Sequence, residues 1–178
     1  MFKVLKLSHL EFEVRDLARM AEFYTEVLGL TETGRERDVC YLSAVIDHHT
    51  IVLRQGTATR LTKIAFQIAP MDSIDVIAHF HLHDLKAERR VGSQPGLNEV
   101  VRTWNTDSVA IEVYSEFEPS THPYSTRGIN PLKLSHVASL SPDLHKLVSF
   151  YTEVMDSSSP TLCRTSSISC AADATITP

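Results

Sequence analysis

The chain has 178 residues, which is enough for one ordinary domain and part of another. Its formal charge of −5, from 17 basic and 22 acidic residues, argues against a nucleic-acid partner, because phosphate binding needs a basic face. The sequence shows no apolar stretch long enough to span a bilayer and no apolar core of a signal peptide, so we expect no membrane partner. The three cysteines, Cys40, Cys163 and Cys170, lack metal-ligand or disulfide-framework spacing and indicate a reducing, cytoplasmic setting.

The first part of the chain predicts a β-α-β-β-β order. Residues 4–14 alternate with period two, which is typical of a strand with Leu7, His9 and Glu11 on one face. Asp16 suits the N-cap of a following helix, and Gly29 suits the left-handed position that ends it. Short strand-like runs follow at about 30–35, 39–45 and 50–53.

The same order then recurs. Residues 61–68 (LTKIAFQI) align in register with residues 7–14 (LSHLEFEV), and we predict a helix over about 72–90 and strands at about 99–104 and 109–115. Residues 4–116 therefore form one complete module of two βαβββ halves. The predicted fold class is α+β, with paired βαβββ units whose curved mixed sheets pack about a pseudo-twofold axis around a cavity.

A longer repeat links the two ends of the chain. Residues 7–28 and 134–155 align without a gap at an offset of 127, with 10 of 22 positions identical, so residues 132–155 begin a second module that stops early. Residues 117–131 are rich in proline and predict a linker. Residues 156–178 are rich in Ser, Thr and Ala, lack apolar periodicity and are expected to be disordered.

Three positions on neighbouring predicted strands are candidates for a metal site. His9 and Glu112 lie on the more polar faces of their strands, and Lys63 takes the place in 61–68 that His9 takes in 7–14. His, His and Glu at these places would form a facial triad for Fe(II), but an ammonium has no lone pair to donate. His9 and Glu112 therefore either bind a metal or, as we favour, line a polar cavity floor without one. His136, the repeat image of His9, would be the first metal ligand of the second module.

The other histidines have two interpretations each. His79 and His83 are spaced as i and i+4 on a predicted helix, which allows a zinc pair, although a solvent-facing surface is the interpretation we favour. His48 and His49 precede a strand and either contact a ligand or belong to a turn.

The segment LSHLEFEVRDLARMAEFYTEVLGL, with His9 on its first strand, resembles the vicinal oxygen chelate superfamily. That superfamily includes glyoxalase I, bleomycin-resistance proteins and extradiol ring-cleaving dioxygenases. The segment VCYLSAVIDHHTIVL at residues 39–53 and the run IEVYSEFEP before the linker are most similar to type I extradiol dioxygenases such as catechol 2,3-dioxygenase.

This resemblance implies an Fe(II)-dependent oxidoreductase that opens the ring of a small catechol-type diol. It also implies that the metal is bound by His, His and Glu of the second module, while the first module is usually metal-free. Because only His136 of that set has a counterpart here, we expect the chain to be inactive alone. The alternatives are a metal-free binding module of the bleomycin-resistance type, or a glyoxalase-like metal-dependent lyase or isomerase that uses His9 and Glu112. The apolar face of the helix predicted within 132–155 lacks its own sheet, so we expect self-association into a homo-oligomer.

Overall fold

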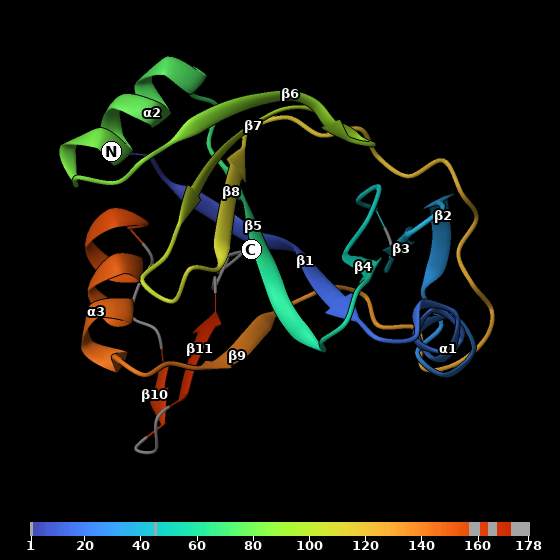
Figure 1. Cartoon of the computed structure of the whole chain (residues 1–178). Helices are drawn as coiled ribbons and strands as arrows, with labels where there is room; N and C mark the ends of the chain where they lie inside the picture. Colours follow the sequence, from blue (N-terminus) through green and yellow to red (C-terminus); the bar gives the residue numbers. More distant parts are fainter. Residues whose placement is uncertain (1, 45, 157–160, 164–166, 172–178) are drawn as a thin grey trace, which may run out of the picture.

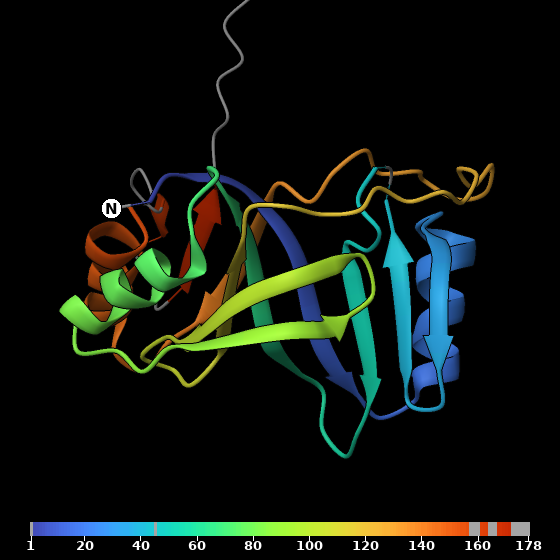
Figure 2. The same ribbon diagram turned by 90° about the horizontal axis from the view of Figure 1, so that it is seen from above.

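The computed structural model describes residues 2–44, 46–156, 161–163 and 167–171. Its main feature is a curled, mixed eight-stranded sheet that forms a half-barrel, with strand order β2-β3-β4-β1-β5-β8-β7-β6 (Figures 1 and 2). The strands in chain order are β1 (Val4–Val14), β2 (Thr31–Glu36), β3 (Val39–Ser43), β4 (Ile51–Gln55), β5 (Arg60–Ile68), β6 (Glu88–Gln94), β7 (Leu97–Trp104) and β8 (Ala110–Tyr114).

The sheet consists of two βαβββ halves joined at its centre. Helix α1 (Leu17–Glu22) extends through a π-helical turn (Phe23–Val27) and packs against β3 and β4, while α2 (Ser73–Leu82) packs against β6 and β7. In each half the first strand pairs in parallel with the last, β1 with β4 and β5 with β8, and the antiparallel β1–β5 pair joins the halves. This symmetric arrangement confirms the predicted fold class.

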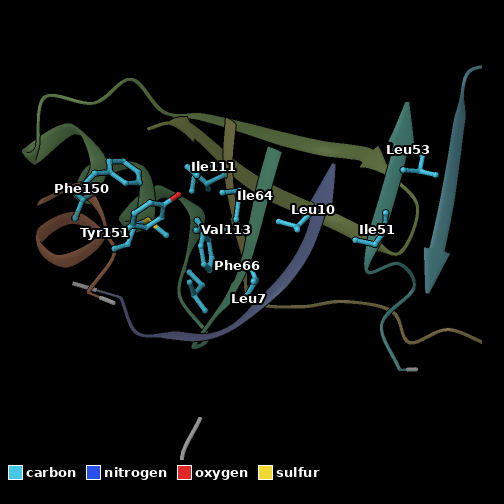
Figure 3. Close-up of a cluster of buried hydrophobic side chains, with 14 of the residues drawn as sticks. Leu7, Leu10, Ile51, Leu53, Ile64, Phe66, Ile111, Val113, Phe150 and Tyr151 are labelled. Carbon is cyan, nitrogen blue, oxygen red and sulfur yellow. The ribbon is translucent and has the colours of Figure 1, made fainter. Parts of the chain in front are cut away.

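A β-bulge in β1 changes which side chains face the core. Leu7 pairs with Phe66 and His9 pairs with Ala65, so Ser8 is an extra residue without a partner across the β1–β5 ladder. Leu7 therefore lies on the helix-covered face with Leu10 (Figure 3), and His9, one register position along, lies on the opposite face. The strict alternation expected from the sequence, with Leu7 and His9 on one face, was wrong because the bulge shifts the register by one residue.

The long repeat produces the same local structure twice. Asp16 Oδ1 caps α1 by accepting a hydrogen bond from the backbone N–H of Arg19 at 3.0 Å. At the offset of 127, Asp143 Oδ1 caps α3 (Leu144–Ser149) by accepting from the N–H of Lys146 at 3.2 Å. The sequence FYTEV forms a π-helical turn after both helices, so local sequence dictates this unit wherever it occurs.

Helix α3 and its π-helical turn (Phe150–Val154) pack on the core of the first module. Leu147, Phe150, Tyr151 and Met155 are buried in the same apolar cluster as Ile64 and the other helix-covered side chains of the large sheet (Figure 3). These side chains are covered within one chain, so the argument for self-association from an uncovered helix face does not hold.

Two predicted boundaries were wrong. The helix expected over 72–90 ends at Leu82, and residues 88–94 form β6 because their backbone groups pair with β7 in a hairpin. Within the segment expected to be disordered, β10 (Thr161–Cys163) and β11 (Ser167–Ala171) form a small antiparallel sheet with β9 (His136–Leu140). β11 is the central strand and pairs with both β9 and β10, so backbone pairing connects all three. The rest of that prediction, at residues 157–160, 164–166 and 172–178, lies outside the described residues.

The predicted linker runs along the rim of the half-barrel back to α1 (Figure 2). The backbone N–H of Ile129 donates to the carbonyl of Val27, and Arg127 forms an ion pair with Glu26. Gly29 lies at this contact with φ of +81°, as expected for the residue that ends a helix. None of the helices in the described part of the chain is long and apolar enough to cross a membrane.

Candidate functional site on the concave face

The structure places His9, Lys63 and Glu112 on the concave face of the three central strands. His9 of β1 pairs with Ala65 of β5, which pairs with Glu112 of β8, so His9 and Glu112 lie in one row across the sheet. Lys63 lies in the next row, opposite Glu11 of β1. The side chains of these residues are buried, and Glu112 is completely inaccessible to solvent.

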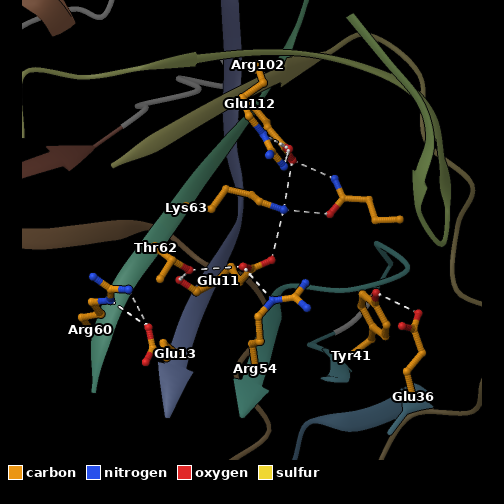
Figure 4. Close-up of polar contacts among 11 residues, drawn as sticks. Glu11, Glu13, Glu36, Tyr41, Arg54, Arg60, Thr62, Lys63, Arg102 and Glu112 are labelled. Atoms are coloured by element: carbon orange, nitrogen blue, oxygen red, sulfur yellow. Dashed lines mark hydrogen bonds and ion pairs between the residues drawn. The ribbon is translucent and has the colours of Figure 1, made fainter. Parts of the chain in front are cut away.

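The Lys63 ammonium lies between two carboxylates. Its Nζ is 3.1 Å from Glu11 Oε2, 3.3 Å from Glu112 Oε2 and 3.3 Å from Gln94 Oε1 (Figure 4). Gln94 Oε1 accepts a hydrogen bond from this ammonium, and the two carboxylates form ion pairs with it. Lys63 therefore joins three strands, β1, β6 and β8, from its own position on β5.

Both oxygens of Glu112 have further partners. Arg102 donates to Oε1 through Nε at 2.9 Å and Nη2 at 2.5 Å, and Gln94 Nε2 donates to Oε2 at 2.9 Å (Figure 4). A buried carboxylate requires this degree of compensation, because removing it from water is costly unless it is paired and hydrogen-bonded.

Glu11 is held in the ionised form by the same cluster. Burial acts to raise the pKa of its carboxyl, but the charges of Lys63 and Arg54 outweigh that effect and keep the pKa below its usual value. Arg54 Nε donates to Glu11 Oε1 at 3.3 Å. We name the five residues Glu11, Arg54, Lys63, Arg102 and Glu112 the concave ion cluster.

Two buried histidines lie beside this cluster. The rings of His9 and His49 are 4.4 Å apart, and within the described residues the Nε2 atom of each lacks a hydrogen-bond partner. Burial and the nearby Lys63 charge lower the pKa of His9 well below its usual value, and burial and the neighbouring His9 do the same for His49. Both imidazoles are therefore neutral, and the cavity of about 10 Å³ that they line with Tyr114 has room for at most one water molecule.

These residues do not fit a divalent metal. Two cationic side chains, Arg102 and Lys63, already neutralise the Glu112 carboxylate, and both of its oxygens are engaged by donors. The described residues contain no group of three or more His, Cys, Asp or Glu side chains placed to hold a metal ion. The geometry therefore favours the metal-free interpretation of His9 and Glu112.

His136 is not brought together with the other two candidates. It begins β9, which pairs with β11 in the small sheet, and its exposed ring contacts Ser135 Oγ through Nδ1 at 3.1 Å. Its assignment as a metal ligand of a second module stays a prediction.

Of the two helix histidines, His83 is exposed as we favoured, whereas His79 is not. His79 is buried, and its Nε2 lies 2.8 Å from the carbonyl oxygen of Val154, so it fastens α2 to the turn that follows α3. The ring of His83 lies 4.9 Å from that of His79, and among the described residues no third ligand joins them. His48 and His49 precede β4, and their Nδ1 atoms are 3.2 Å apart.

Sequence reasoning missed Glu11, Gln94 and Arg102 as members of the site. Glu11 could have been found, because it lies two residues after His9 and therefore on the same strand face. Gln94 and Arg102 belong to the β6–β7 hairpin, whose first strand the sequence did not predict and whose register it did not specify.

Comparison with known proteins agrees with this architecture. The model of the Glyoxalase/Bleomycin resistance protein/Dioxygenase superfamily matches residues 6–96. A curated relative, the manganese-dependent 2,3-dihydroxybiphenyl 1,2-dioxygenase of Geobacillus genomosp. 3, is 23% identical over 155 residues, which cover 76% of this chain and 48% of the relative. The chain thus spans about half the length of that relative.

Solved structures with the same fold include dioxygenases and a glyoxalase. An extradiol ring-cleaving dioxygenase from B. fuscum matches with 26% identity and a TM-score of 0.61, over 66% of this chain and 34% of that protein. The 2,3-dioxygenase LapB from a Pseudomonas species (24% identity, TM-score 0.74) matches over 86% of this chain and 59% of its own. The Mn(II)-bound glyoxalase from Novosphingobium aromaticivorans has 24% identity and a TM-score of 0.75, over 86% of this chain and 53% of that protein. With the curled sheet of two βαβββ halves, the family match shows that this chain belongs to the Glyoxalase/Bleomycin resistance protein/Dioxygenase superfamily.

Proposed function

We propose that this chain supplies the first module, and the opening strand and helix of the second, of an extradiol dioxygenase-type oxidoreductase that acts on catechol-type aromatics in the cytoplasm. The observation that carries the proposal is the match of 155 residues, extending beyond a single module, to a 2,3-dihydroxybiphenyl 1,2-dioxygenase. In this proposal the first module is a scaffold, because its concave ion cluster leaves no position for a metal.

The proposed metal site belongs to the second module, with His136 as its first ligand. A curated relative is named as manganese-dependent and a structural neighbour as Mn(II)-bound, which supports a divalent metal, and Fe(II) is the ion that we propose. Bound there, the metal would supply a Lewis-acid centre for the two oxygens of a small aromatic diol. A single imidazole does not hold such an ion against water, so we expect no turnover by this chain alone.

A chimeric protein tests this proposal. Residues 1–155 of this chain would replace the equivalent N-terminal part of the Geobacillus dioxygenase, and ring cleavage of 2,3-dihydroxybiphenyl would be followed by the colour of the ring-opened product. We expect an active chimera that loses both bound metal and activity on His136→Ala. The matched control is His145→Ala, which removes an exposed histidine of the same segment and should leave activity unchanged.

Two results would contradict the proposal. The first is ring cleavage by the purified chain itself with Fe(II) or Mn(II), which would show that it builds its own metal site. The second is a chimera that binds metal equally well with and without His136. Isomerisation of a glutathione hemithioacetal by the purified chain would instead support the glyoxalase-like alternative.

A metal-free ligand site at His9 receives little support from the geometry. The cavity beside His9 is about 10 Å³, whereas pockets for drug-sized ligands are about 300–1,000 Å³. The space beside His9 is thus too small for such a ligand, whereas a groove of about 430 Å³ lies elsewhere, where α2 meets β7 and β8.

A further inference from the structure

The concave ion cluster has a feature that a scaffold does not require: a lysine buried between two carboxylates at the centre of the sheet. We infer that the Lys63 ammonium is a built-in cation that takes the position of a divalent metal ion beside His9 and Glu112. The first module is then metal-free because its own side chain supplies the charge. This inference deepens the proposed function, since it rests on the first module being a scaffold.

The position of Lys63 is the first argument. The register of residues 61–68 on residues 7–14 makes Lys63 the structural counterpart of His9 in the other half of the module. The two strands are neighbours in the sheet, and β8 with Glu112 lies directly beside β5. A lone-pair donor at position 63 would therefore complete a set of His, His and Glu on three adjacent strands.

Charge is the second argument. Glu11 Oε2 and Glu112 Oε2 both lie within 3.3 Å of one nitrogen, so the two carboxylates are close to each other. Two carboxylates that share a site cannot both stay ionised unless a cation lies between them. Lys63 supplies that cation without any ion from solution.

The hydrogen-bond geometry is the third argument. The ammonium donates a hydrogen bond to Gln94 and forms ion pairs with Glu11 and Glu112, so it is surrounded by acceptors from three strands. These contacts assign Lys63 the compensation of the two buried carboxylate charges as its role.

The test compares Lys63→His with Lys63→Met in thermal unfolding and Co(II) titration. In a chelator, we expect both variants to unfold at a lower temperature than the wild type, because the two carboxylates lose the cation between them and keep only their separate partners Arg54 and Arg102. Added Co(II) should bind Lys63→His in a 1:1 ratio, with a visible absorption band, and should restore its unfolding temperature. Lys63→Met and the wild type should not respond, and adding His9→Gln to Lys63→His should abolish the response.

Two outcomes would overturn the inference. One is stoichiometric Co(II) binding by the wild type that is lost on His9→Gln, since Lys63 would then not exclude a metal. The other is a folded Lys63→His protein with no gain in Co(II) affinity, since Lys63 would then not occupy the metal position.

A measurement on the wild type covers the case in which the variants do not fold. In reductive methylation of the native protein, Lys63 should react at least about tenfold more slowly than the exposed Lys86 and Lys133, because modification needs the cluster to open. Equal rates would show that the ammonium is not held between the carboxylates. Inactivity of the chimera described above would not affect any of these measurements, so the two proposals can fail separately.

Discussion

Leu147→Ala tests whether the segment that begins the second module is an integral part of the first module's core. Leu147 lies in α3 and is 1% exposed, in the same cluster as Phe150 and the apolar side chains of the large sheet (Figure 3). If this packing exists in solution, truncating the side chain should destabilise the whole module and not only the helix that carries it.

The expected loss follows from burial. Complete burial of a leucine side chain is worth about 1.5–3 kcal/mol, and the cavity left by truncation brings Leu→Ala changes in cores to about 2–5 kcal/mol. Because α3 lies at the end of the core and can move to fill part of the cavity, we expect about 3 kcal/mol in the free energy of unfolding. The matched control is Leu132→Ala, in the same segment but 80% exposed, which should cost less than about 0.5 kcal/mol.

Urea unfolding with two probes gives the measurement. Far-ultraviolet circular dichroism reports on all elements, and the fluorescence of Trp104, the only tryptophan, reports on β7 of the large sheet. In Leu147→Ala we expect the transitions followed by the two probes to have the same urea midpoint, lower than that of the wild type. The dependence of the free energy of unfolding on urea concentration should not change. A Trp104 transition within about 0.5 kcal/mol of the wild type would refute the reasoning, because α3 would then not be coupled to the sheet.

Two further predictions concern protonation and a glycine. Because His9 and His49 have pKa values well below 6.5 in the folded state, only the unfolded state gains their protons as the pH falls below 6.5. The free energy of unfolding should therefore be insensitive to these groups at pH 8 and should fall by up to about 1.4 kcal/mol per pH unit for each histidine below pH 6.5. Urea unfolding at several pH values between 8 and 5 gives the dependence of the free energy of unfolding on pH, and His49→Gln should make this dependence weaker. An equal weakening in His81→Gln, which replaces an exposed histidine as a control, would contradict the assignment. Gly29→Ala should destabilise the protein by more than Gly92→Ala, whose cost should be about 1–2 kcal/mol, as judged by thermal or urea unfolding. Both glycines have positive φ, but only at Gly29 would a Cβ lie 2.1 Å from a linker carbonyl oxygen, so equal losses would argue against that close contact.

Local sequence predicted the elements where short-range chemistry decides them. Asp16 and Gly29 mark the two ends of the first helical segment because a side-chain cap and a left-handed residue act within one turn. The register of 61–68 on 7–14 predicted the two-half architecture, since equivalent patterns bury equivalent faces. Prediction failed at residues 88–94, where the partner strand β7 overrides a helix-like pattern.

The members of the candidate site depended on long-range pairing. His9, Lys63 and Glu112 were predicted as strand positions that could converge, and the concave face brings them to one region. The contact of Lys63 with Gln94 could not be predicted, because it follows from the β6–β7 hairpin, whose register the sequence did not specify.

By itself, the sequence determined the curled two-half fold, the caps and the repeated strand–helix unit, because periodicity and capping act between residues a few positions apart. Only the tertiary structure decided that Lys63 is the cation between Glu11 and Glu112, and that α3 completes the core of the first module. Both depend on which side chains meet from strands and helices far apart in the chain, and that choice is made by packing and by the cost of leaving a buried charge unpaired.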